Sequence, residues 1–322
     1  MITRDPRRFA ALAAGLAPDF GPATARAAFL VAPDGFALAG ESASDNRYMA
    51  GAGAFDAPRA LAQHRALHQA LSATLPTVCF AGHADTPDAL FPNNVFATAR
   101  PDAAVDAAAA PRLVVGRMRH PVRQREAARS DIRAWFTDML GYEPVDLSAQ
   151  PHPCELTGAL VIDRARGIGI AGLSERCDET GARLMHEAFG LRATLLLDLA
   201  AGEYHANVVL AILAGRAALV CPGGFADPAV VAAISALYAP HALLLSAAEQ
   251  AAFAGNAIAL SGDAAWMSEG AAAALSDAHR DALDAAGFAL RSVPLDAIEA
   301  AGGSLRCCVA EIFAAPAGRA RA

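Results

Sequence analysis

A thiol, an imidazole and a carboxylate each stand at the start of an apolar segment, at Cys307, His205 and Glu155. A cysteine thiolate is a strong nucleophile, and a histidine carries protons near neutral pH. A carboxylate beside that histidine can orient it. The three residue types together predict cysteine-based transfer of an acyl or amidino group. Taken singly, each has an ordinary alternative, which is a buried thiol, an exposed histidine or a solvated carboxylate.

The same arrangement, polar residues followed by an apolar strand-like run, recurs along the chain. The runs are FPNNVFAT (91–98), ELTGALVID (155–163), YHANVVLAI (204–212), GNAIAL (255–260) and RCCVAEIF (306–313). Intervals of 64, 49, 49 and 51 residues separate their anchors, which are Asn94, Gly158, Asn207, Asn256 and Cys307. A period of about fifty residues predicts a propeller or another repeat array, although Ala-rich α/β sequences also produce such spacings by chance.

The segments between anchors predict the remainder of each unit. After residue 158 come a strand-like run over 167–173, a helix over 178–189 and a further strand-like run over 194–201. Asp178 is placed to cap that helix. Each unit therefore reads strand, strand, helix, strand, and five units would close into a ring with their polar ends on the axis. The predicted fold class is α/β, a five-bladed pseudo-symmetric ββαβ propeller forming a single domain.

The predicted organisation has three parts. Residues 1–26 form an N-terminal extension expected to be helical, 27–315 the catalytic α/β domain, and 316–322 a C-terminal tail. The N-terminal segment lacks a signal-peptide h-region, so we expect a cytoplasmic protein. The segment RPDAAVDAAAAPR (100–112) is low in order-promoting side chains and predicts a mobile lid.

Composition excludes several classes of protein. All 26 basic residues are arginines, so the chain has no Schiff-base lysine, no lysine to anchor pyridoxal phosphate and no Walker A loop. The net charge of −7 and the dispersed arginines argue against a nucleic-acid partner. No uncharged apolar run reaches the ~18 residues of a membrane span. Six cysteines without paired spacings predict reduced thiols rather than disulfides or a zinc site.

Taken in order, FPNN, E-x-T-G, SERCDE, YHANVVLAI, GNAIAL and GGSLRC resemble the guanidino-group-modifying superfamily. This superfamily includes arginine deiminases, dimethylargininases and amidinotransferases. The similarity is greatest to the citrulline-utilization hydrolase branch and extends from Ala27 to Phe313. It implies the five-bladed pentein propeller, a small amino-acid substrate, and no metal or cofactor. A homo-oligomer is compatible with it.

The resemblance also implies the catalytic roles. The nucleophile falls on Cys307 because it follows the arginine of R-C, and Cys308 stands where the family usually has methionine. If both lie in a strand, they point to opposite faces and only one can face the pocket. The general acid/base falls on His205 and the carboxylate on Glu155. Leu156 departs from the branch, which usually has glycine there.

Two amides bear on the substrate. Asn94 and Asn207 stand where arginine-directed relatives carry aspartates that bind a cationic guanidinium. An amide can both donate to and accept from a neutral ureido group, which favours citrulline. Arginine dihydrolase branches also carry the first Asn, so the dihydrolase and deiminase reactions, dimethylargininase and amidinotransferase remain alternatives. A non-catalytic binding module, as in a ribosome-binding initiation-factor relative, is the alternative from another class.

Further residues are candidates for binding substrate. Arg176 in SERCDE could bind the substrate carboxylate bidentately, and its alternative is an exposed loop arginine. Arg306 is next to the nucleophile but would face away from it in a strand. The remaining candidates are amides, namely Asn46, Asn93 and Asn256.

Overall fold

The structure is a computed structural model that describes residues 1–49, 56–100 and 109–315. The predicted tail over 316–322 lies outside the described residues, and so does most of the predicted lid segment.

Five sheets are present in the described residues, and four of them share one pattern. In each of those four, the first strand pairs antiparallel with the second, which pairs in parallel with the third. These sheets consist of β15 (Ala310–Ile312), β2 (Ala27–Val31) and β3 (Thr77–Phe80); β4 (Phe96–Ala99), β5 (Arg112–Val115) and β6 (Glu143–Asp146); β7 (Leu160–Asp163), β8 (Ile168–Leu173) and β9 (Ala193–Asp198); and β10 (Leu210–Leu213), β11 (Ala217–Val220) and β12 (Ala242–Leu244).

The fifth sheet pairs β13 (Ala264–Ser268) in parallel with β14 (Ala289–Val293). An isolated antiparallel bridge joins Ile258 to Trp266 of β13, in the place that a first strand takes in the other sheets. The N-terminal segment adds β1 (Ile2–Thr3) in parallel beside β9, and α1 (Pro6–Ala14) packs against α9. The N-terminal segment is thus packed against the rest of the protein.

Helices connect the second and third strands of the sheets. They are α3 (Ala57–Ser72), α4 (Pro121–Gln124), α5 (Ser130–Ala134), α7 (Glu179–Phe189), α9 (Pro228–Leu237), α11 (Glu269–Ala274) and α12 (Asp277–Ala285). Shorter turns of helix are α2 (Gly40–Ala43), α10 (Ala247–Ala251), α13 (Asp296–Glu299), η2 (Glu126–Ala128), η3 (Trp135–Met139) and η4 (Pro222–Gly224).

Helix α7 shows how the sequence determines where such a helix begins, where it ends and which face it buries. The Asp178 side chain accepts from the Gly181 N–H and caps the helix, as the sequence predicted. The helix ends at Gly190, whose φ of 64° is left-handed and is reached without strain by glycine. Ala182, Met185 and their neighbours on the same face are buried, so α7 packs on its sheet through one apolar stripe.

Of each segment predicted as a strand, only the second half takes part in a sheet. In four of the five, a single turn of helix comes first and the strand follows it. These turns are η1 (Pro92–Asn94), α6 (Leu156–Ala159), α8 (Ala206–Val209) and α14 (Leu305–Cys308). Short apolar runs do not distinguish helix from strand by periodicity, and so the turn was missed. Cys307 and Cys308 therefore lie in α14, and the strand-alternation argument does not apply to them.

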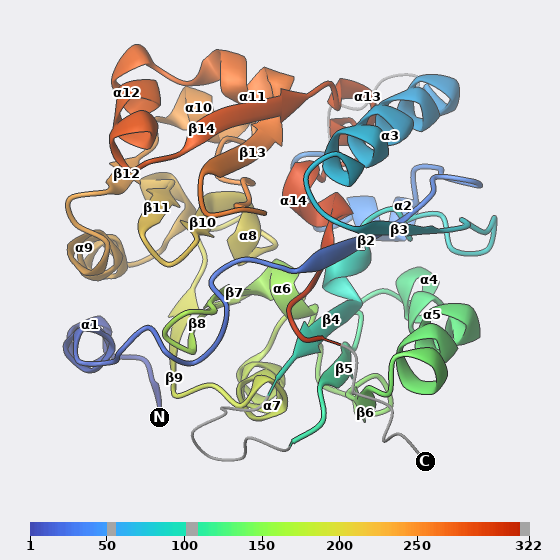
Figure 1. Ribbon diagram of the computed structural model, residues 1–322, viewed down its shortest axis with the longest axis horizontal. Helices are drawn as coiled ribbons and strands as arrows, with labels where there is room; N and C mark the ends of the chain where they lie inside the picture. The colour runs from blue at the N-terminus through green and yellow to red at the C-terminus, as the bar shows by residue number, and fades with distance from the viewer. Residues whose placement is uncertain (50–55, 101–108, 316–322) are drawn as a thin grey trace.

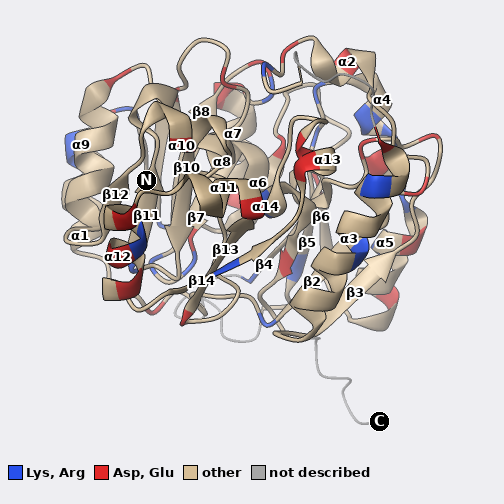
Figure 2. Cartoon of the chain, turned by 90° about the horizontal axis from the view of Figure 1, so that it is seen from above, with Lys and Arg blue, Asp and Glu red and all other residues tan. Residues whose placement is uncertain are grey.

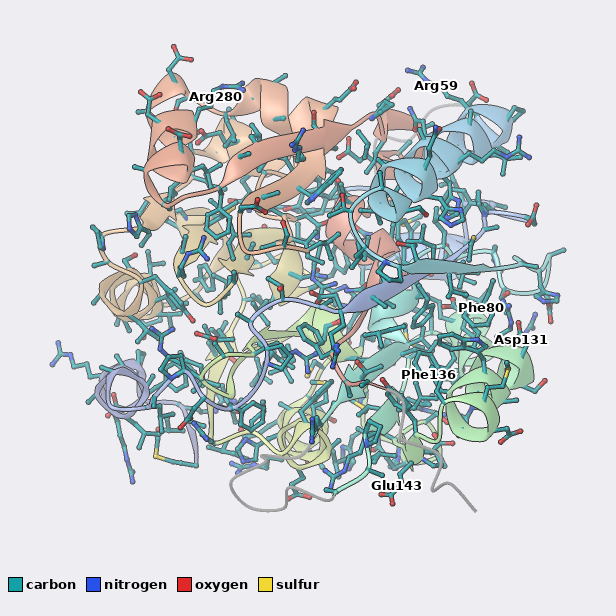
Figure 3. All side chains as sticks on the ribbon, in the orientation of Figure 1. Arg59, Phe80, Asp131, Phe136, Glu143 and Arg280 are labelled. Carbon is teal, nitrogen blue, oxygen red and sulfur yellow. The ribbon has the colours of Figure 1, made fainter. Side chains whose placement is uncertain are left out.

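The arrangement confirms the α/β class, with mixed sheets, while the closed five-bladed ring stays a prediction. Figure 1 shows the sheets around a centre where α6, α8 and α14 lie, with α1, α3, α5, α7, α9 and α12 outside. Figure 2 shows that acidic and basic residues are scattered along the chain. Side chains fill the space between the sheets, and Phe136 lies among them (Figure 3). No helix in the described ranges is long and apolar enough to cross a membrane.

Candidate active site

The single helical turns before the inner strands bring the predicted catalytic residues together. Turn α6 contacts both η1 and α8, and α14 contacts η1. Glu155 lies immediately before α6 and His205 immediately before α8, while Cys307 lies within α14. All three side chains are buried. Segments up to about 210 residues apart in sequence thus share one small volume.

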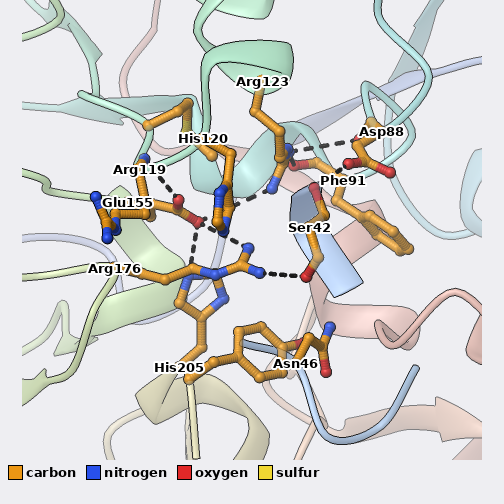
Figure 4. Close-up of polar contacts among 12 residues, drawn as sticks. Ser42, Asn46, Asp88, Phe91, Arg119, His120, Arg123, Glu155, Arg176 and His205 are labelled. Carbon is orange, nitrogen blue, oxygen red and sulfur yellow. Dashed lines mark hydrogen bonds and ion pairs between the residues drawn. The ribbon is translucent and has the colours of Figure 1, made fainter. Parts of the chain in front are cut away.

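His205 and Glu155 form a buried pair (Figure 4). The Nε2 atom of His205 lies 2.9 Å from Oε2 of Glu155, and the other carboxylate oxygen accepts the N–H of Arg119 at 3.0 Å. Burial alone would raise the pKa of Glu155, but the charge of Arg176 at 3.5 Å, the His205 hydrogen bond and the charge of Arg123 at 3.9 Å lower it well below its usual value. Glu155 is therefore ionised at neutral pH.

The tautomer of His205 follows from this contact. Burial lowers the pKa of His205 even though Glu155 acts in the opposite direction, so the imidazole is neutral. An ionised carboxylate can only accept, and Nε2 therefore carries the proton. The other nitrogen, Nδ1, is buried and has no hydrogen-bond partner among the described residues. His205 thus offers an unprotonated nitrogen that is ready to take a proton.

Gly158 keeps the space beside Nδ1 open. A Cβ at Gly158 would lie 2.8 Å from Nδ1 of His205 and 2.5 Å from Oδ1 of Asn94, too close for any side chain. The glycine of E-x-T-G is therefore required by close approach rather than by backbone conformation. Oδ1 of Asn94 is itself buried and without a hydrogen-bond partner in the described part of the chain. Two free acceptors consequently meet beside this glycine.

Cys307 lines a narrow cavity whose empty space, with its open mouth included, is about 300 Å³. Burial raises the pKa of its thiol, while hydrogen bonds, of which the largest comes from Asn256, act to lower it. The amide of Asn256 lies 3.4 Å from the sulfur and that of Asn207 lies 3.8 Å from it. Cys308 is fully buried and is not among the residues that line the cavity. Of the two adjacent cysteines, only Cys307 lines this cavity.

Two arginines line the same cavity. Arg176 is held by Asp45 at 2.5 Å and stacks over the Tyr204 ring at 5.0 Å. Arg123 donates to both oxygens of Glu126, at 2.8 and 2.9 Å. The cavity therefore presents two guanidinium groups whose positions are fixed by carboxylates.

A carboxylate also lines the cavity. Asp88 is buried and accepts from the Ser42 hydroxyl at 2.5 Å. Sequence reasoning missed Asp88, Arg123 and Tyr204. Asp88 and Arg123 lie in polar segments without periodicity. The sequence offered a signal for two of the three residues: Asp88 lies shortly before FPNN, and Tyr204 immediately precedes the predicted catalytic histidine.

The remaining predicted binding residues occupy different places. Asn46 lines the cavity and donates to the Gly302 carbonyl at 3.1 Å. Asn93 contacts Thr157 at 3.4 Å and does not line the cavity. Arg306 pairs with Glu311 at 2.9 Å and lines a separate cavity of about 500 Å³. The structure thus brings Asn46 to the cavity of Cys307 but not Asn93 or Arg306. Within the described ranges, no group of His, Cys, Asp or Glu side chains is arranged to hold a metal ion.

Comparisons with known proteins identify the family of the chain. A family model described as N,N dimethylarginine dimethylhydrolase, eukaryotic, matches residues 32–314. No curated protein matches the chain in sequence. The N-terminal domain of ArgZ, a cyanobacterial arginine dihydrolase of the ornithine–ammonia cycle, is similar with a TM-score of 0.75 at 22% identity, over 89% of this chain and 98% of that one.

Two further structures are similar. Unliganded AgrE has a TM-score of 0.74 at 23% identity, over 89% of this chain and 39% of that one, so the similarity covers only part of AgrE. A His-to-Gly variant of dimethylarginine dimethylaminohydrolase, as its adduct with S-methyl-L-thiocitrulline, has a TM-score of 0.68 at 16% identity, over 89% of this chain and 100% of that one.

The match of the family model over residues 32–314 and the α/β fold shared with these structures place the chain in the guanidino-group-modifying superfamily. Within it, the chain belongs to the N,N-dimethylarginine dimethylhydrolase family, a family of guanidino-group hydrolases.

Proposed function

We propose that this protein hydrolyses C–N bonds of an amino acid bearing a ureido or guanidino group, with citrulline as the first candidate substrate and ornithine, CO2 and ammonia as products. The observation that supports this proposal most directly is the geometry at one cavity. The Cys307 thiol lines it, and the buried His205–Glu155 pair lies in the adjoining turns with one imidazole nitrogen unprotonated. A binding module needs no such combination of groups.

The steps use the groups in the order that their chemistry dictates. The Cys307 sulfur attacks the central carbon of the ureido group while its proton passes to Nδ1 of His205. His205 then protonates the departing nitrogen, and a covalent thiocarbamate remains on the sulfur. Nδ1 of His205 then deprotonates a water, which attacks the thiocarbamate carbon and breaks its bond to sulfur. This step frees the thiol and releases carbamate, which decomposes to CO2 and ammonia. Glu155 keeps Nε2 protonated and stabilises the imidazolium form throughout.

The charges around the cavity suit the two ends of an amino acid. Arg123 and Arg176 bring two positive charges to the cavity, which would attract the carboxylate of an amino acid. Asp88, on the same cavity, offers a carboxylate to an ammonium group. We therefore expect the amino-acid backbone of the substrate to bind here and its side chain to reach towards Cys307.

Citrulline is preferred because of the amides near the thiol. Oδ1 of Asn94 is a buried acceptor without a partner among the described residues, and an N–H of the ureido group would satisfy it. Asn207 lies 3.8 Å from the sulfur and brings no charge. An uncharged surface of this kind suits a neutral ureido group better than a cation.

Arginine is the second candidate substrate, with loss of two ammonia molecules. The similarity to ArgZ and AgrE favours it, since ArgZ is described as an arginine dihydrolase and its structures include a complex with substrate and a covalent intermediate. Dimethylarginine is a third candidate, on the description of the family model.

We also propose that the five sheets close into a five-bladed ring around the site. The repeated strand order supports this, as does the contact of β15 with β4 and of β7 with β10 between neighbouring sheets. The Cys307 cavity would then lie at the axis.

An end-point assay tests the proposal. Purified protein is incubated separately with citrulline, arginine and asymmetric dimethylarginine, and ornithine, citrulline, ammonia and dimethylamine are quantified, with Cys307→Ser in parallel. Ornithine and ammonia from citrulline, absent with the Ser variant, support the first candidate. Ornithine from arginine but not from added citrulline moves the assignment to a dihydrolase, and dimethylamine moves it to a dimethylargininase. No product from any substrate refutes the proposed function.

A further inference from the structure

We infer that Asn256 is a catalytic residue that stabilises the thiolate of Cys307 through an N–H···S hydrogen bond, and that it does not bind substrate. Asn256 is fully buried, between α10 and β13, and does not line the Cys307 cavity. The inference rests on the proposed function for its role in turnover, but the contact itself is independent of the substrate.

The orientation of the Asn256 amide is fixed by its surroundings. Its Oδ1 accepts the backbone N–H of Arg306 at 3.0 Å, and its Nδ2 donates to the backbone carbonyl of Asn207 at 2.8 Å. A flipped amide would set NH2 against N–H and oxygen against oxygen, and would lose both bonds. The NH2 group is therefore the end that faces Sγ of Cys307, at 3.4 Å.

A donor fixed on the sulfur favours its ionised form. A hydrogen bond to a charged group is stronger than one to its neutral form, so this N–H binds the thiolate more tightly than the thiol. Nucleophilic attack requires the thiolate, and burial opposes it at this site. The amide of Asn207 is a weaker candidate for the same task. Its nitrogen and oxygen lie 3.8 and 3.9 Å from the sulfur, so the amide does not present a single donor.

The location of Asn256 explains why it is suited to this role. It is one of the repeat anchors, and it holds the Arg306 N–H that immediately precedes the nucleophile in the chain. The same side chain therefore positions the backbone of α14 and polarises its thiol. A substrate-binding residue would instead direct its amide into the cavity.

The test measures the ionisation of Cys307 without any substrate. Carboxamidomethylation by iodoacetamide is followed by peptide mass spectrometry across pH 6 to 10.5 for the wild type, Asn256→Asp and Asn256→Ala. The Asp variant keeps the acceptor for the Arg306 N–H and removes the donor to sulfur together with the bond to the Asn207 carbonyl, whereas the Ala variant removes all three contacts. Asn93→Ala is the matched control, because its buried amide contacts Thr157 rather than the sulfur.

Both Asn256 variants should raise the apparent pKa of Cys307 alkylation and slow alkylation at pH 7.5 at least tenfold, the effect of about one pKa unit. The Asp variant should be the slower of the two, since it adds a negative charge. Asn93→Ala should leave the profile unchanged. A wild-type profile in Asn256→Asp overturns the inference. If the alkylation shifts occur but no substrate is turned over by the wild type, the thiolate contact stands and the proposed function fails.

Discussion

Nε2 of His205 and Oε2 of Glu155 lie 2.9 Å apart, and both side chains have no solvent exposure. This contact decides which imidazole nitrogen is free, because the ionised carboxylate can only accept. It also commits Glu155 to a role through His205, although two arginines lie near the same oxygen. We therefore expect turnover to depend on this contact and on the residues beside it.

Glu155→Gln should lower kcat for the best substrate by about 10² to 10⁴, the range of a lost general acid–base contribution. The amide can still accept from Nε2 but cannot stabilise an imidazolium. Steady-state kinetics should show KM changing far less than kcat. A fall of less than threefold would mean that Glu155 is structural, and circular dichroism of the variant checks that it folds.

Gly158→Ala should abolish most activity while the protein remains folded. The added methyl group would meet Asn94 and His205 at 2.5 and 2.8 Å, and both must move. A displacement of about 1 Å in a reacting group can cost about 10² in rate. Gly190→Ala, at an open position with no atom within 4 Å of its added Cβ, is a control for folding and should cost stability but little activity. Activity within threefold of the wild type in Gly158→Ala would contradict the proposed geometry.

Asn94→Asp should shift the preference towards arginine. The carboxylate would pair with a cationic guanidinium, whereas the neutral ureido group gains no such pair. We expect the ratio of kcat/KM for arginine to that for citrulline to rise at least tenfold. An unchanged ratio would show that this position does not select the substrate, and Asn46→Asp tests whether a second amide on the cavity does so instead.

Glu249→Ala should lower Tm at pH 7 by roughly 1–3 °C, corresponding to about 1–2 kcal/mol for a lost cap in a chain of 322 residues. Glu249 closes the capping box of α10 with Ser246, and it also bonds His279 at 2.6 Å. Burial would raise its pKa, but these hydrogen bonds lower it to about 2. A lowered carboxylate pKa stabilises the fold above the unfolded value, and this stabilisation is lost as pH falls through about 2.

The difference in Tm between the wild type and Glu249→Ala should therefore be largest at pH 7 and smaller at pH 3. Glu269→Ala, an exposed first-turn residue of α11, is the control and should change Tm far less. A deficit that grows on acidification would mean that the pKa of Glu249 is raised by folding rather than lowered.

Much of the candidate site could be predicted because its side chains lie at the repeat anchors or two to three residues before them. Cys307, His205 and Glu155 follow from spacing, residue type and the family resemblance, and Asp178 follows from the sequence preference of a helix cap. The helical turns before the inner strands were not predictable, since a four-residue turn has too few positions to show a period. Arg123 could not be predicted, because nothing in the sequence distinguishes a buried arginine from the many other arginines of this chain.

Tertiary context decided the remaining assignments. Arg306 is next to the nucleophile in sequence, but its guanidinium extends towards Glu311, so adjacency did not predict function. Asn256 was expected at the substrate, yet its two amide atoms are occupied by backbone groups that come from segments about fifty residues away on either side. Such hydrogen bonds depend on how neighbouring sheets pack together, and the sequence around Asn256 does not predict them.

The pairing of β15 with β2 has a consequence for how the enzyme is made. Ala310 is opposite Phe29, so the sheet beside the nucleophile joins a strand that is synthesised early to one that is synthesised late. Closing so long a stretch of chain is slow, because its entropy is lost before the contacts form. Until α14 docks, the nascent protein carries its imidazole and carboxylate without the thiol. The hydrolysis proposed above therefore requires that α14 has been synthesised and has docked beside His205 and Glu155.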